Sequence, residues 1–181
     1  MKRAAITLII LAFVSEAYSQ KETSRLNIGL GLNYTSYMFR ADVKPSIHLG
    51  IGYDFSNRVG VYGSFTSHKS IKGTPADKTF VLSLHALPRL VGTYKSKFSW
   101  YFPAGVSLVS MKDYYSGEQL QQIGFTVNIG TGVQYRINKL SLFSDFNVGF
   151  ATSEYKRKVL LSGYDYLSLN TGVKIPIGKL E

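Results

Sequence analysis

The sequence has no cysteine among its 181 residues, and it lacks long hydrophobic runs. Without cysteine, a disulfide framework, a thiolate metal site and a lipoprotein acyl anchor are all excluded. The apolar segment 4–14 is too short to cross a bilayer as a helix, and no later stretch approaches the ~18 apolar residues that a membrane helix requires. Whatever stabilises the fold is therefore non-covalent, and we expect no helical membrane anchor.

Acidic residues are scarce, because 11 Asp and Glu stand against 21 Lys and Arg, for a formal net charge of +10. The basic residues are spread over expected connections and strand ends. They do not form a long basic face interleaved with stacking aromatics, so nucleic acid is not an expected partner. Contact with anionic lipid head groups and ordinary solvated loops both account for the basic balance.

Residues 1–19 are typical of a secretory signal peptide. Lys2 and Arg3 precede the apolar segment 4–14, and the small-residue pattern Ala17-Tyr18-Ser19 follows it. We expect cleavage before Gln20, which leaves residues 20–181 as one domain.

After residue 24, large apolar residues alternate with Gly, Ser, Asn or Thr in eight stretches of about ten residues. In the clearest stretch, Leu26, Ile28 and Leu30 are separated by Asn27 and Gly29. A period of two residues is that of a β-strand. The second face of a soluble sheet would carry Lys and Glu, whereas this one is mostly small and neutral. We therefore expect the apolar face to meet lipid.

The pattern predicts an all-β fold, an eight-stranded antiparallel up-and-down transmembrane β-barrel. The third and fourth strands are the least regular, because Tyr62, Val81 and Leu87 fall on the opposite parity. If both termini lie in the periplasm, the long connections face the exterior. The expected strands are 25–37, 46–55, 59–67, 79–93, 98–109, 122–137, 140–151 and 165–178, joined by short turns at 56–58, 94–97 and 138–139 and by long loops at 38–45, 68–78, 110–121 and 152–164.

Aromatic residues in the outward register gather toward the strand ends, which predicts two belts at the head-group layers. The strand preference of aromatic residues is the alternative explanation. The loop-end set is Tyr34, Phe65, Phe80, Phe125 and Phe150, and the turn-end set is Tyr53, Phe55, Trp100, Phe102 and Tyr135.

The chain resembles the small eight-stranded outer-membrane barrels of the OmpA transmembrane-domain and OmpX type, including the outer membrane protein beta-barrel domain family. Recurring strings in 27–31, 48–53 and 128–135 carry the resemblance. It implies insertion in the cell outer membrane, with lipids and lipopolysaccharide as neighbours. Segment 170–177 also resembles the last-strand signal for the assembly machinery, although the chain ends Gly178-Lys179-Leu180-Glu181 without the usual aromatic residue.

Inward parity selects the charged strand residues, which we expect to form a polar network in a lumen filled by Tyr62 and Tyr101. We expect Asp145 to pair with Lys174, with Arg136 or Arg89 nearby. A structural role is the leading interpretation, and a proton or ion path is the alternative. The network comprises His48, Asp54, His85, Arg89, Arg136, Asp145 and Lys174.

Two features leave a lipid A modifying enzyme open as an alternative to a non-enzymatic barrel. His68 and Ser70 could act as base and nucleophile, and the string 68–70 resembles a pair found in lipid A deacylases. Pro88 and Pro103 each remove a ladder donor from neighbouring strands, and palmitoyl-transferring barrels admit lipid through proline-bearing gaps. Bulges that curve the wall are the preferred explanation of the prolines.

The leading hypothesis is an integral outer-membrane barrel without enzymatic activity, whose exterior loops contact surface lipids, host molecules or envelope proteins. The cluster Lys156, Arg157 and Lys158 could bind the phosphates of lipopolysaccharide or another anionic ligand, or simply be solvated. No metal site or cofactor is predicted. A narrow channel and a soluble lipocalin-like carrier are further alternatives.

A His68→Ala variant tests the enzyme alternative. Because a non-enzymatic barrel does not act on lipid A, we expect mass spectrometry to give the same lipid A profile for cells that express the variant and the wild type. A profile that changes with the substitution would establish lipid A chemistry.

Overall fold

The computed structural model describes residues 25–37, 40–69, 76–115, 118–151 and 165–177. The predicted signal peptide, Ser70 and the cluster Lys156 to Lys158 lie outside these residues. All assigned segments are strands: β1 (Arg25–Tyr37), β2 (Arg40–Asp54), β3 (Val59–Lys69), β4 (Ala76–Val91), β5 (Phe98–Tyr101), β6 (Ala104–Tyr115), β7 (Glu118–Ile137), β8 (Leu140–Ala151) and β9 (Tyr166–Ile177).

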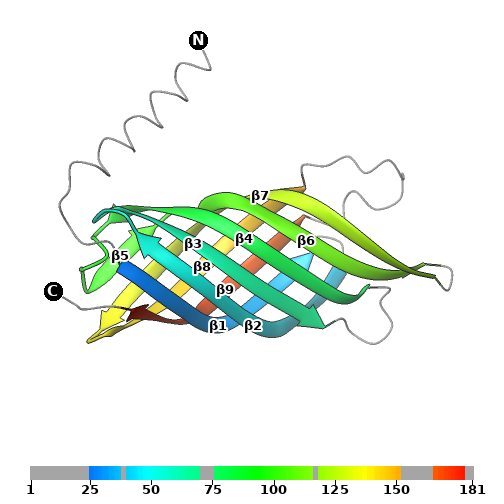
Figure 1. Cartoon of the computed structure of the whole chain (residues 1–181), viewed down its shortest axis with the longest axis horizontal. Coiled ribbons are helices and arrows are strands. Elements are labelled where there is room, and N and C mark those ends of the chain that lie inside the picture. Colours follow the sequence, from blue (N-terminus) through cyan, green and yellow to red (C-terminus); the bar gives the residue numbers. More distant parts are fainter. Residues whose placement is uncertain (1–24, 38–39, 70–75, 116–117, 152–164, 178–181) are drawn as a thin grey trace, which may run out of the picture.

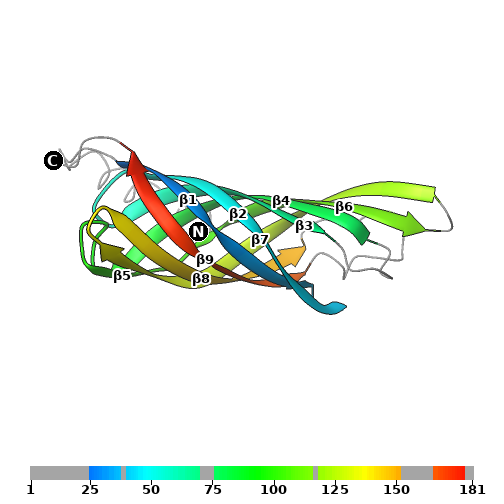
Figure 2. The ribbon, with the colours of Figure 1, turned by 90° about the horizontal axis from the view of Figure 1, so that it is seen from below.

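The strands form one closed antiparallel barrel (Figures 1 and 2). Strands that follow one another in the chain pair, apart from β5 and β6, and closure comes from β1 and β9, where Leu26 lies opposite Ile177. Segments β5 and β6 occupy one wall position, because both pair with β4 on one side and β7 on the other. The predicted eight-stranded barrel is therefore confirmed.

The break between β5 and β6 falls at Phe102 and Pro103. Pro88 of β4 lies beside it, since the Phe102 amide donates to the Pro88 carbonyl at 2.9 Å. On the other side, the Gly130 amide donates to the Pro103 carbonyl at 2.8 Å. Hydrogen bonds thus continue across the wall on both sides of the interruption, which suits a bulge-like irregularity.

The short turns lie where the sequence predicts them, but two of the expected long loops are wrong. Strand β2 occupies 40–45 of the expected loop 38–45, and β6 and β7 occupy 110–115 and 118–121 of the expected loop 110–121. Only 38–39 and 116–117 are left between the strands. Lys112 pairs with Gln121 in this extension. Beyond the apolar band both faces of a ribbon can be polar, so apolar alternation no longer marks where pairing ends.

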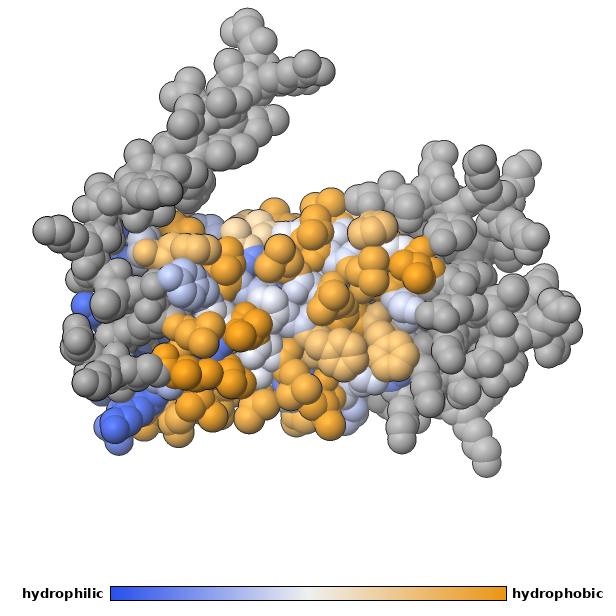
Figure 3. All heavy atoms as spheres, in the orientation of Figure 1, coloured by the Kyte–Doolittle hydropathy of each residue, from blue (hydrophilic) through white to orange (hydrophobic). Residues whose placement is uncertain are grey.

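The outer face of the barrel is apolar and exposed. Ile47, Leu82 and Leu84 are 65%, 57% and 57% exposed, and comparable residues occur on the other strands. Figure 3 shows an apolar band on the visible face of the barrel, with hydrophilic residues near the turn end, the end that carries 55–58, 92–97 and 138–139. Monomeric soluble proteins rarely expose contiguous apolar patches larger than a few hundred Å².

No helix among the described residues is long and apolar enough to span a membrane.

Inward glycines make room for three tyrosine rings. A Cβ at Gly29 or Gly50 would lie 2.0 or 2.1 Å from the Tyr62 hydroxyl oxygen. Gly132 gives space to Tyr101 in the same way, and a Cβ at Gly149 would lie 2.4 Å from Cε1 of Tyr166. These small residues on the inward face therefore leave room for the tyrosine rings inside the barrel. Tyr62, Val81 and Leu87, which interrupt the alternation, are buried inside.

A Gly50→Ala variant tests this use of glycine. The added methyl overlaps the Tyr62 ring, so we expect a loss of unfolding free energy of about 1–3 kcal/mol, measured by urea titration of the refolded barrel. Gly63→Ala is the matched control, because a Cβ there meets Cγ2 of Ile51 at an ordinary 3.8 Å. Equal stability of the two variants would contradict the packing described.

Candidate functional site in the barrel lumen

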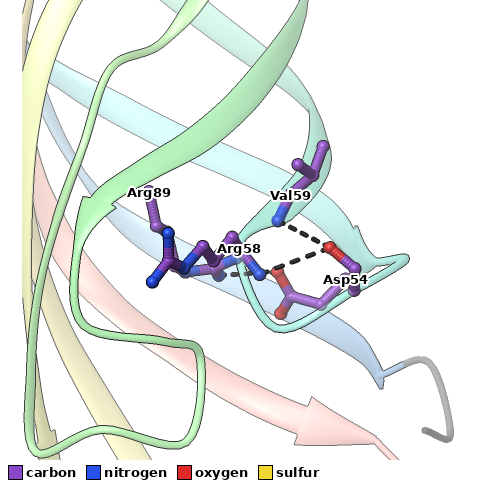
Figure 4. A network of polar contacts seen from close by, with 5 residues as sticks. Asp54, Arg58, Val59 and Arg89 are labelled. Atoms are coloured by element: carbon purple, nitrogen blue, oxygen red, sulfur yellow. Dashed lines mark hydrogen bonds and ion pairs between the residues drawn. The ribbon is translucent and has the colours of Figure 1, made fainter. Parts of the chain in front are cut away.

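An ion pair lies inside the turn end of the lumen. Nη2 of Arg89 on β4 donates to Oδ1 of Asp54 on β2 at 2.6 Å, and the two side chains are 3% and 10% exposed. Figure 4 shows the guanidinium and carboxylate facing one another beside the turn that carries Arg58 and Val59. The Ser56 hydroxyl accepts the amides of Arg58 and Val59, which fixes this turn. The pair therefore joins two strands separated by β3.

Lys174 lies among aromatic rings in the turn half of the lumen. Its Nζ is 4.7, 5.1 and 5.0 Å from the ring centroids of Tyr62, Tyr101 and Phe143. Such distances allow cation–π attraction, which is stronger when the ammonium is desolvated. His48 stacks on Tyr62 with centroids 5.9 Å apart, and its Nε2 lies 3.3 Å from the Tyr62 hydroxyl. This level combines a buried cation with rings from several walls.

The carboxylate of Asp145 is held by neutral donors. Its Oδ1 accepts hydrogen bonds from the amides of Asn147 and Asn170 at 2.6 and 2.7 Å, and its Oδ2 accepts one from the Tyr101 hydroxyl at 3.3 Å. These donors offset part of the cost of burying a polar group away from water.

The predicted ion pair between Asp145 and Lys174 is wrong. Among the described residues, the side-chain ion pair within 4 Å is that of Arg89 with Asp54. In the β8–β9 register, Asp145 lies opposite Asn170, whereas Lys174 lies opposite Ser141. The two groups line one inner cavity at different heights. Counting from the strand ends misplaced them, because the long connection between β8 and β9 leaves their stagger undetermined.

Neutral polar residues fill the loop half of the lumen. Asn128 donates to the Ser107 hydroxyl, and its Oδ1 accepts the hydroxyls of Thr126 at 3.0 Å and Tyr166 at 2.8 Å. Nε2 of His85 lies 3.4 Å from Nδ2 of Asn128. Sequence reasoning missed this network because it selected charged residues. The inward parity of the Asn, Ser and Thr residues was the available signal.

The remaining candidates occupy different places. Arg136 lies at the turn-end mouth of the lumen and not deep inside it. Its Nε donates to the Asn138 carbonyl at 3.1 Å. His68 is buried in β3, opposite Thr79 of β4. Ser70, its predicted partner, lies outside the described residues. Among the described residues, no cluster of three or more His, Asp or Glu could hold a metal ion.

The predicted belt residues lie on or near the outer face. The rings of Tyr53 and Phe55 meet edge to face with their centroids 4.9 Å apart, and the Phe65 ring stacks on Phe80 with centroids 6.0 Å apart. Nε1 of Trp100 donates to the Thr131 hydroxyl at 2.6 Å. The half-buried members are Tyr34, Phe80 and Phe102, and the exposed ones are Tyr53, Phe55, Phe65, Trp100, Phe125, Tyr135 and Phe150. Their level relative to the head groups stays a prediction.

An apolar exterior around a polar, ring-filled interior defines the class of small transmembrane β-barrels. The sequence model described as "Outer membrane protein beta-barrel domain" matches residues 5–175. The chain belongs to this family and is an outer-membrane protein, as the resemblance implied. No curated protein matches the sequence.

Several solved structures share the fold. The N-terminal barrel domain of Pseudomonas aeruginosa OprF has a TM-score of 0.66 at 16% identity, covering 87% of this chain and all of that domain (100%). Neisserial surface protein A has a TM-score of 0.63 at 18% sequence identity, and the match covers 85% of this chain and 99% of that protein's chain. A third structure is the Ail protein of Yersinia pestis in complex with the heparin analogue sucrose octasulfate. It has a TM-score of 0.55 at 17% sequence identity, and the match covers 85% of this chain and 97% of the Ail chain.

An Asp54→Asn variant tests the buried ion pair. It leaves the Arg89 guanidinium without its counter-charge, so we expect a loss of unfolding free energy of about 3 kcal/mol in phosphate-free buffer. The double variant Asp54→Asn, Arg89→Gln removes both charges and should recover part of that loss. A double variant that is less stable than the single variant would contradict a compensating pair.

Proposed function

We propose that the protein is a non-enzymatic integral outer-membrane barrel, closed to ions, whose loop end contacts surface lipids or ligands. The observation that supports the proposal best is the contact between opposite walls. Tyr62 on β3 and Phe143 on β8 are four strand positions apart around the barrel, yet their ring centroids are 6.4 Å apart. This contact across the barrel supports a lumen that side chains block at this level, as expected for eight strands.

The charged groups described above suit a structural role. Asp54 compensates Arg89, Lys174 is surrounded by rings, and Asp145 accepts neutral donors. The Arg89–Asp54 ion pair and the Tyr101–Asp145 hydrogen bond each join strands two wall positions apart, which favours a structural network over a permeation path.

The loop end carries the proposed contacts with other molecules. Lys156, Arg157 and Lys158 provide positive charge for lipopolysaccharide phosphates or another anionic surface ligand. The likeness to Ail, which has been crystallised with a sulfated heparin analogue, supports an anionic partner by analogy of fold. The proposed belts would meet the head groups, since aromatic side chains favour that interface.

Export and assembly complete the proposal. Residues 1–19 would direct the chain across the inner membrane, and residues 20–181 would form the barrel domain. Segment 170–177 lies in β9, which pairs with both β8 and β1. A last strand that closes the barrel is a suitable element for recognition by the assembly machinery.

Planar-bilayer recording tests the closed lumen. We expect no stepwise conductance from the wild type, because rings from opposite walls block it. The variant Tyr62→Ala, Tyr101→Ala removes two of these rings and should conduct. The matched control Tyr53→Ala, Tyr135→Ala removes two outward rings and should stay silent. Conductance of the wild type at the level of the lumen variant would contradict the proposal.

A further inference from the structure

The turn end of the lumen opens into a polar pocket that the proposed function does not use. Side chains from β2, β4, β7, β8 and β9 line it, together with the 138–139 turn. The pocket is thus built by the barrel wall and not by one loop.

Positive charge dominates the described wall of this pocket. Arg89, Arg136, Lys139 and Lys174 carry four positive charges, and Asp54 carries one negative charge, for an excess of +3. Like charges that share a confined, partly desolvated site repel one another more strongly than in water. A bound anion would relieve this repulsion.

Arg89 provides a second, independent observation. The ion pair with Asp54 uses Nη2, while Nε and Nη1 are buried and have no hydrogen-bond partner among the described residues. Buried donors are normally satisfied, and a charged donor is the costliest to leave unpaired. The guanidinium is therefore suited to donate to an acceptor that the barrel wall does not supply.

We propose that this pocket binds a small multivalent oxyanion of the phosphate type. Such an anion offers several acceptor oxygens and more than one negative charge, which matches the charge excess and the unpaired donors of Arg89. The neutral wall includes Gln134 and Ser141, whose amide and hydroxyl can donate further hydrogen bonds. Lys139 is exposed at the mouth of the pocket, where it attracts the anion. Arg89 is buried in the pocket wall, where it can donate hydrogen bonds to the anion.

The test uses the refolded full-length mature chain in maltoside micelles, which contain no phosphate. Titration with inorganic phosphate, followed by ³¹P line broadening, should show saturable binding at low ionic strength. The variants Lys139→Gln and Arg136→Gln, Lys139→Gln should weaken binding, the double variant by about tenfold. Lys97→Gln is the matched control, because Lys97 is exposed at the same end of the barrel but does not line the pocket.

Thermal unfolding provides a second measurement that does not depend on the NMR signal. A ligand that binds the folded state raises its unfolding temperature, so phosphate should stabilise the wild type and Lys97→Gln more than the pocket variants. This comparison covers a variant that folds less well, because each variant is compared with and without phosphate.

Three results would overturn the proposal. The first is an absence of saturable broadening for the folded wild type. The second is an equal loss of binding in Lys97→Gln and the pocket variants, which would indicate general surface charge. The third is displacement of phosphate by phosphatidylglycerol added to the micelles, which would assign the site to a lipid head group. Binding that survives this lipid supports a soluble oxyanion.

Discussion

The requirement that the backbone satisfy its own hydrogen bonds governs the rest of this structure. Lipid offers the outward face no partners, so an open sheet edge would leave a row of unpaired amides and carbonyls. Closure of β1 on β9 removes that edge. Even at Pro103, which cannot donate, the chain keeps hydrogen bonds to both neighbouring strands. The number of strands then determines the width of the lumen and hence what it can contain.

A narrow lumen explains residues that otherwise look unrelated. Gly29 and Gly50 have no side chain because Tyr62 occupies that space, and Gly132 serves Tyr101 in the same way. Charges inside such a space need compensation. Asp54 supplies it for Arg89, but the turn end as a whole keeps an excess of positive charge. Aromatic rings from opposite sides of the barrel therefore meet inside it, and the pocket at the turn end keeps an excess of positive charge.

Much of the fold could be predicted from the sequence, because successive side chains of a strand point to opposite faces, and here one face meets lipid and the other the lumen. The bounds of β1 and β8 agree with the predicted strands, and the wall position shared by β5 and β6 was foreseen as one strand. The extensions of β2 and β6 could not be predicted, because a strand pair that projects beyond the bilayer needs no apolar face. Pairing inside the lumen was also out of reach: parity correctly turns Asp145 and Lys174 inward, but the barrel stagger decides their heights.

The most direct test is to measure whether the outward face of the barrel lies in lipid or in water. Because the chain has no cysteine, single spin labels can be placed at Val127, Ile129 and Val133 of β7, with Lys139 as the aqueous reference. In reconstituted bilayers, the account predicts that labels on β7 collide more often with oxygen than with a water-soluble nickel chelate, and that the Lys139 label does the reverse. Preference for the nickel chelate along β7 would place this face in water and contradict the account.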